Sequence, residues 1–289
     1  MAVVDDLTHP SAKRVRRGGD GLIAAGSLIL LIVLFGAVAA PWLSQWGPTE
    51  IDPIAFLERP GPGHWLGTDG NGMDIWSRIL FAARIDLGVA VASVALAVLV
   101  GGTIGLATGY AGGWVEETTM RLLDIVQAFP VFILALTVAA LLGNSLHTLI
   151  LAIGLINAPA YARLMRAEVR SLKSHIYIEA AECAGNSRLS ILFRHLLPNA
   201  LTPLLVIAPL NCGWAILMLA GLSFLGLGVA VPTAEWGAMI STGAADVVGG
   251  RWWTSVFPGL ALFTALLGCN LVGEGVRDLL DPRSTGPSA

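Results

Sequence analysis

Long apolar runs, separated by short charged segments, constrain the fold of this chain more than any other feature of its sequence. An α-helix needs about 20 apolar residues to cross the roughly 30 Å of hydrocarbon in a bilayer. Runs of that length recur along the 289 residues, of which 55% are hydrophobic and 13% are charged. The mean hydropathy of +0.74 is also typical of a membrane protein. We therefore predict an all-α membrane protein, in place of the one or two soluble domains that the length alone suggests.

The apolar runs divide into six predicted transmembrane helices, at residues 21–42, 87–111, 118–142, 145–163, 200–229 and 252–275. The third and fourth helices share one uncharged run, Ile125 to Ala162, which is too long for a single span and breaks at Gly143-Asn144-Ser145. The first helix is expected to remain as an anchor, because its apolar core is too long for a cleaved signal and five spans follow.

Basic residues set the expected orientation, since loops rich in Lys and Arg stay in the cytoplasm. An even number of spans puts both termini on one side. That side holds thirteen cations: Lys13, Arg14, Arg16, Arg17, Arg121, Arg163, Arg166, Arg170, Lys173, Arg188, Arg194, Arg277 and Arg283. The other side holds four: Arg59, Arg78, Arg84 and Arg251. We expect cytoplasmic tails at 1–20 and 276–289, an external loop at 43–84, and a five-helix core at 85–275 that carries a cytoplasmic loop at 164–198.

Several classes of function are disfavoured by what the sequence lacks. A net charge of -3 does not favour a nucleic-acid surface, which needs clustered cations. The chain has no Gly-x4-Gly-Lys-Ser/Thr phosphate-binding loop, so ATP hydrolysis is not expected of it. Its five histidines lack paired metal spacing and its three cysteines lack C-x-x-C spacing. We therefore predict no catalytic, metal or cofactor site in this chain.

The segment between the fourth and fifth predicted spans has a distinctive spacing. Glu179-Ala180-Ala181 is followed by Gly185, and Leu197-Pro198 closes the segment nineteen residues after the glutamate. We expect two short helices hinged at Gly185, the second from Arg188, with Pro198 at a new helix start. The small alanines permit the close approach of another surface. The helix–glycine–helix pattern by itself is equally typical of an ordinary solvated loop.

Two further sets of residues are candidates for contacts inside the membrane. Glycines recur at every fourth position on one predicted helix face, a pattern typical of close helix–helix packing. They are Gly101, Gly105, Gly109 and Gly113. Polar side chains deep in a span usually face a neighbouring helix or a wet cavity. Three such residues, which either line a transport path or bond helices together, are Asn157, Asn211 and Asn270.

Short motifs follow one another in a specific order along almost the whole chain. They are Gly67-Thr68-Asp69 with Gly72 and Asp74, Gly109-Tyr110, Gly112-Gly113-Trp114, Arg121, Asp124, Phe129-Pro130, the Glu179 to Pro198 spacing, Leu222 to Gly228, Glu235-Trp236-Gly237, and Arg277-Asp278 with Asp281-Pro282-Arg283. Together they resemble the peptide subgroup of binding-protein-dependent ABC importer permeases. The resemblance implies the type I importer (MetI-like) architecture in a bacterial inner membrane.

The resemblance also implies partners and roles. Such a permease pairs with a second, different permease, receives peptides from an extracytoplasmic binding protein, and docks on ATPase subunits that bind ATP and Mg²⁺. The residues that the resemblance assigns to ATPase docking are Glu179, Ala180, Ala181, Gly185 and Arg188. Met73 stands where the subgroup usually has Arg, which puts an external ion pair in doubt. His195 replaces the aliphatic residue of the broad motif and narrows the resemblance to the peptide subgroup.

An ion-coupled secondary transporter is the main alternative of a different class. Such carriers usually place ionisable residues in mid-membrane for coupling. The one candidate in the predicted spans is Glu274, which lies close to the cytoplasmic end of the last span, where an interfacial role fits better. A purely structural membrane scaffold would leave the Glu179 to Pro198 segment without a purpose. We therefore favour a transport subunit that draws on an external energy source.

Overall fold

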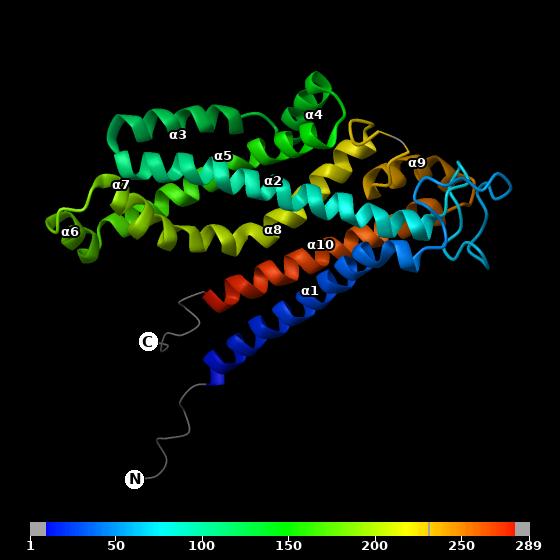
Figure 1. Ribbon diagram of the computed structural model, residues 1–289, viewed down its shortest axis with the longest axis horizontal. Coiled ribbons are helices and arrows are strands. Elements are labelled where there is room, and N and C mark those ends of the chain that lie inside the picture. The colour runs from blue at the N-terminus through cyan, green and yellow to red at the C-terminus, as the bar shows by residue number, and fades with distance from the viewer. Residues whose placement is uncertain (1–9, 231, 281–289) are drawn as a thin grey trace, which may run out of the picture.

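The described residues form helices joined by short turns and by two longer segments, 44–74 and 225–235 (Figure 1). The computed structural model describes residues 10–230 and 232–280, and the side chains of 19–230 and 232–280. Parts of the two predicted tails, including Asp281-Pro282-Arg283, lie outside these residues. The elements are α1 (Pro10–Leu43), α2 (Ile75–Ala111), α3 (Gly113–Gln127), α4 (Val131–Leu142), α5 (Leu146–Lys173), α6 (Ile176–Cys183), α7 (Arg188–Ser190), the π-helix η1 (Ile191–Leu196), α8 (Leu197–Phe224), α9 (Trp236–Val248) and α10 (Trp253–Leu280).

Five helical segments of the described chain are long and apolar enough to cross a membrane. They are Gly19–Leu43, Ile75–Ala111, Leu146–Lys173, Arg188–Phe224 and Trp253–Leu280. Each contains most or all of one predicted span, which confirms the all-α membrane fold. A sixth span is possible only if α3 and α4, which are bent by 83° at their junction, are taken together.

The third predicted span, at 118–142, is wrong as a single straight helix. It is split at residues 128–130 between α3 and α4. Pro130, with φ -55° and ψ 121°, precedes the first residue of α4. A residue before proline avoids the helical region, so α3, which ends at Gln127, does not continue through Phe129. The charged residues of α3 also separate it from the uncharged α4, so the apolar run conceals two elements of different character.

The second span starts earlier in the structure than in the prediction. α2 begins at Ile75, inside the predicted external loop, because the Asp74 carboxylate accepts a hydrogen bond from Ser77 N–H at 2.7 Å and caps the helix. With 37 residues, α2 is about 55 Å long and exceeds the hydrocarbon thickness. α5 likewise continues to Lys173, ten residues past the predicted end.

The predicted second short helix of the 164–198 loop is not a separate element. α7, η1 and α8 form one continuous helical segment from Arg188 to Phe224. Pro198 lacks an N–H, so it cannot complete the regular hydrogen-bond ladder. The chain accommodates it in the first turn of α8, directly after the π-helical turn of η1, instead of breaking the helix.

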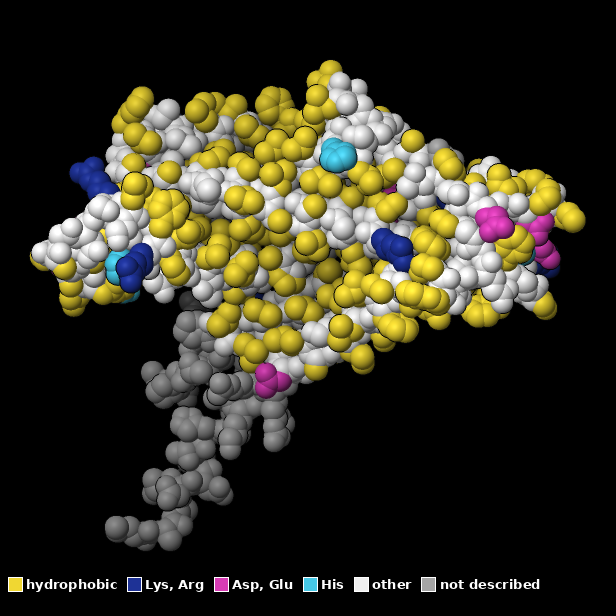
Figure 2. All heavy atoms as spheres, viewed as in Figure 1, with side chains coloured by type: hydrophobic (Ala, Val, Ile, Leu, Met, Phe, Trp, Pro, Cys, Tyr) yellow, Lys and Arg dark blue, Asp and Glu magenta, His cyan; other side chains and the backbone are white. Residues whose placement is uncertain are grey.

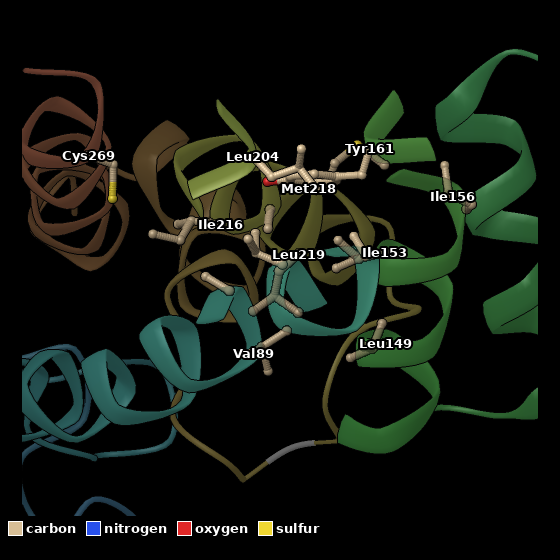
Figure 3. Close-up of a cluster of buried hydrophobic side chains, with 14 of the residues drawn as sticks. Val89, Leu149, Ile153, Ile156, Tyr161, Leu204, Ile216, Met218, Leu219 and Cys269 are labelled. Atoms are coloured by element: carbon tan, nitrogen blue, oxygen red, sulfur yellow. The ribbon is translucent and has the colours of Figure 1, made fainter. Parts of the chain in front are cut away.

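The packed core lies where α2, α5 and α8 meet. Val89 of α2 contributes to it, together with Leu149 and Ile153 of α5 and Ile216 and Leu219 of α8 (Figure 3). α1 packs along α10 beside this core (Figure 1). Figure 2 shows apolar side chains over the middle of the molecule, while acidic side chains gather at the end formed by the 44–74 segment. The middle of the surface therefore suits hydrocarbon.

Candidate functional site

The loop between α5 and α7 folds as a tight knob. α6 carries Glu179 and Ala180 on its exposed side, whereas Ala181 is turned inward. Gly185 ends the turn with φ +78°, a conformation that suits glycine. The N–H of Asn186 donates to Ala181 O at 3.1 Å, and its side-chain amide donates to the same oxygen at 3.0 Å. These bonds fix the direction in which the chain leaves α6.

Buried side chains anchor the knob to the bundle. Ile178 of α6 and Ile191 of η1 are both buried, as is Leu196 at the end of η1. The Ser187 hydroxyl oxygen accepts from Ser190 N–H at 3.3 Å and caps the helix that leads into η1. The knob is therefore joined to the membrane helices by apolar packing and a continuous helix.

The outer face of the knob is apolar as well as charged. Ile176 is 82% exposed, Leu189 68% and Phe193 57%. Arg188, the basic member of the predicted docking set, is also exposed. The sequence analysis did not single out these three apolar residues, although three exposed apolar side chains in a charge-rich segment are typical of a protein contact. Four of the predicted docking residues, Glu179, Ala180, Gly185 and Arg188, are thus exposed on the knob together with these apolar side chains.

The knob lies at the same end of the molecule as the first described turn of α1 and the last turn of α10 (Figure 1). The 44–74 segment and α9 lie at the opposite end. Helices long and apolar enough to cross a membrane run between the two ends.

The glycines of α2 lie against the backbone of α5. A Cβ atom on Gly101 would overlap Ala158 O, and one on Gly105 would overlap Ala162 O. A Cβ atom on Gly109 would lie 3.0 Å from Arg166 O. Gly113 does not belong to this stripe. It begins α3 with φ +57° after the chain has turned, and a Cβ atom there would meet nothing within 4 Å.

Two of the three asparagines lie together between α5 and α8. Asn157 donates to Asn211, and Asn211 in turn donates to the Tyr161 hydroxyl at 3.0 Å. Both asparagines are half-buried. Asn270 is exposed on α10, and its Oδ1 lies near Gly213 of α8, where a Cβ atom would be 3.6 Å away. The arrangement supports helix bonding for the first two residues, while Asn270 is exposed at the surface of the described structure.

Charged side chains join α3 to α5 on the knob side of the bundle. The largely buried Glu116 of α3 lies 3.2 Å from Arg166 Nη1 and 3.0 Å from Arg170 Nη1. A cavity of about 490 Å³ lies beside these residues. Arg163 pairs with Asp124 in the same way at 3.1 Å. α3 is therefore held to α5 by ion pairs.

The opposite end of the molecule is fastened by a buried arginine. Arg78 Nη1 donates to Pro48 O at 2.9 Å and to Pro232 O at 3.1 Å, which links the 44–74 segment to the 225–235 segment. It also donates to the sulfur of the buried Met73 at 2.7 Å. Arg78 Nε lies 3.6 Å from Asp69. Arg78 thus provides a buried cation for this segment, in which Met73 occupies the position of the expected arginine.

The fold and the knob define a class of protein: a polytopic membrane subunit with a packed helical protrusion at one end of its spans. The comparisons with known proteins identify that class. The chain belongs to the family described as "Binding-protein-dependent transport system inner membrane component", whose model matches residues 101–286. It is thus a membrane-embedded permease component of an ABC importer, a transport subunit and not an enzyme.

Similarity to individual relatives extends over most of the chain. The probable D,D-dipeptide transport system permease protein DdpC of Escherichia coli is 39% identical, over 93% of this chain and 90% of its own. The dipeptide transport system permease protein DppC of Alkalihalophilus pseudofirmus is 41% identical, over 91% and 84%. The glutathione transport system permease protein GsiD of Pectobacterium atrosepticum is 38% identical, over 90% and 86%. The resemblance to peptide permeases is thereby confirmed.

Proposed function

We propose that this permease carries peptides across a bacterial inner membrane, beside a second and different permease. The peptide class is supported by relatives named for transport of dipeptides, D,D-dipeptides and glutathione. An extracytoplasmic binding protein delivers the substrate, and separate ATPase subunits bind ATP and Mg²⁺. The knob and both termini lie in the cytoplasm, in keeping with the excess of cations on that side.

The knob is the proposed ATPase-docking surface, with Glu179, Ala180, Gly185 and Arg188 exposed on it. Ala181 belongs to the predicted set but is buried, so it supports α6 from the inside and does not face the partner. The observation that carries this proposal is the continuous helix from Arg188 to Phe224, which begins in the knob and runs through the bundle. A packed helix moves as a unit, so displacement of the knob is transmitted to the α8 face that touches α2 and α5. ATP-driven movement of the ATPase can thus change the opening between the helices.

The docking face combines two kinds of contact. Exposed Ile176, Leu189 and Phe193 offer apolar area to a partner, while Glu179 offers a carboxylate to its hydrogen-bond donors. Ala180 adds little bulk, so the partner backbone can approach α6 closely. The partner is expected to present a cleft with apolar walls and at least one donor.

Uptake of a labelled dipeptide tests the proposal in cells that lack this chain. Wild-type protein is expected to restore uptake that continues in the presence of an uncoupler and stops when the ATPase is inactivated. Glu179→Lys is expected to reduce uptake without lowering the amount of protein in the membrane. Glu274→Lys, an exposed charge reversal on α10, is the matched control. Uptake that collapses with the uncoupler and persists without ATPase activity would contradict the proposal.

A further inference from the structure

Two carboxyl groups are completely buried at the end of the molecule opposite the knob. Asp86 lies on α2 and Glu235 directly precedes α9, and both residues are 0% exposed. The two groups lie close together, because the N–H of Trp236, the residue directly after Glu235, donates to Asp86 Oδ2 at 3.3 Å. Two neighbouring carboxylates away from water cannot both stay charged without strong repulsion. This pair therefore needs either a cation or a proton.

The basic side chains on the elements that surround Asp86 and Glu235 bind other groups. Arg84 of α2 donates to Ala37 O, and Arg78 donates to Pro48 O and Pro232 O. α9 carries one charged residue after its first turn, Asp246, and α8 carries none. The charged residues of α10, namely Glu274, Arg277 and Asp278, lie near its far end, while Arg251 precedes its first turn. Among the described residues, no ion pair involves Asp86 or Glu235.

The hydrogen bonds around the pair show where a proton is needed. Glu235 accepts from Gly237 N–H through Oε1 and from Ala238 N–H through Oε2, each at 2.7 Å, so both oxygens are bonded at the N-terminus of α9. Asp86 Oδ2 accepts from Trp236 N–H at 3.3 Å. Asp86 Oδ1 is buried and has no partner in the described structure. A proton on Asp86 Oδ1 would satisfy this atom and the Glu235 carboxylate together.

We propose that Asp86 and Glu235 form a proton-binding site, in which one proton held on Asp86 Oδ1 is donated to Glu235 and fastens α9 to α2. The helix N-terminus favours the charge on Glu235, since its N–H groups already point at that carboxylate. The neutral acid on Asp86 then supplies the remaining donor. The Trp236 indole, which donates to Ile79 O at 3.2 Å, holds the same helix end against α2.

Release of the proton has a defined consequence for α9. Without it, two adjacent carboxylates repel each other in a buried site, and their separation requires the N-terminus of α9 to leave α2. The attachment is therefore firm at low pH and weakens as the pH rises and the proton is lost. α9 follows the 225–235 segment at the end of the molecule opposite the knob (Figure 1). If the knob is cytoplasmic as proposed, the proton therefore holds a helix at the external end of the permease.

Infrared spectroscopy of the purified full-length chain tests the proton directly. At neutral pH the exposed acids are ionised, so a carboxylic-acid carbonyl band reports the shared proton. We expect this band in the wild type and in Glu58→Gln, which changes an exposed acid at the same end. We expect its loss in Asp86→Asn, because the amide supplies the donor permanently. Absence of the carbonyl band from the wild type would overturn the proposal, whether or not Asp86→Asn folds. Persistence of the band in folded Asp86→Asn would also overturn it.

Hydrogen exchange of the α9 amides tests the attachment. After correction for the intrinsic pH dependence of exchange, the protection of Gly237 and Ala238 is expected to fall as the pH rises in the wild type. The same amides in Asp86→Asn are expected to keep constant protection, because its donor does not titrate. An identical pH trend in the two proteins would show that the pair does not control α9, and would overturn the proposal.

Discussion

The side-chain amide of Asn157 donates a 3.2 Å hydrogen bond to Oδ1 of Asn211 and thereby joins α5 to α8. Asn211 extends the contact, since its own amide donates to the Tyr161 hydroxyl at 3.0 Å and to Ile207 O at 3.2 Å. Side-chain hydrogen bonds between helices of this kind help to hold membrane bundles together. The contact therefore ties the helix that continues from the knob to the helix that packs on α2.

Asn211→Leu is expected to lower the free energy of unfolding by about 1 kcal/mol, because it removes the link while keeping a similar volume. Thermal unfolding in detergent measures the change. Asn270→Leu is the control, since Asn270 is exposed on α10 and its replacement is expected to leave stability unchanged. Equal loss in both variants would contradict the assignment. Unchanged peptide uptake in both would remove these residues from the transport path.

The spans could be predicted because the physics that selects them is local. Charges are excluded from hydrocarbon, so the lengths of uncharged runs located α1, α5 and α10. The early start of α2 could not be seen in this way. Its first turns contain Arg78 and Asp86, which look like loop residues until Pro232 O and Trp236 N–H, more than 100 positions away, provide their partners. Long-range contacts decide such cases.

The knob was predictable in part for the same reason. Gly185 indicated a turn, and a turn there depends on the glycine itself, whose φ is +78°. The apolar face was not predictable, because the pattern does not show which way a short helix turns. Ile176 and Ile178 lie two residues apart, yet the first is exposed and the second buried. The break before Pro130 was missed because the sequence carries no charge from Ile125 to Ala162, although the proline itself was a visible signal.

Acid is expected to loosen the 44–74 segment through Asp52. The Ile54 N–H donates to Asp52 Oδ1 at 2.9 Å and holds the pKa of Asp52 below its ordinary value of 3.8. Desolvation raises the pKa of Asp52, whereas His64, which lies 3.6 Å from its carboxylate, lowers it. Because the pKa of Asp52 is lower in the folded than in the unfolded protein, ionised Asp52 stabilises the folded state at pH values above its ordinary pKa. This stabilisation is lost as the pH falls through the folded-state pKa of Asp52. Hydrogen exchange at Ile54 measured from pH 5 downward reports the loss.

Asp52→Asn is expected to remove the part of this acid dependence that arises from Asp52. Its amide oxygen can still accept from Ile54, but it does not titrate. Glu58→Gln is the matched control, because Glu58 is an exposed acid in the same segment. A steeper acid response in Asp52→Asn than in Glu58→Gln would contradict the prediction.

Close packing of α2 on α5 makes Gly105 sensitive to a single methyl group. A Cβ atom at this position would overlap Ala162 O and approach Met165 Cβ to 2.7 Å. An alanine in a helix gains about 1 kcal/mol over glycine through intrinsic propensity. Overpacking costs about 1 to 3 kcal/mol, and a backbone oxygen has little freedom to move aside. Gly105→Ala is therefore expected to lower the unfolding midpoint.

Gly88→Ala separates the two effects, because Gly88 lies in the same helix and a Cβ atom there would meet nothing within 4 Å. Gly88→Ala gains the higher helix propensity of alanine without overpacking, so its unfolding midpoint is expected to stay the same or rise. Disulfide cross-linking between cysteines placed on α2 and α5 should also slow in Gly105→Ala and not in Gly88→Ala, since only the first pushes the helices apart. Because the overlap at Gly105 involves the backbone of α5, equal midpoints in the two variants would show that α2 and α5 do not approach this closely in the folded protein.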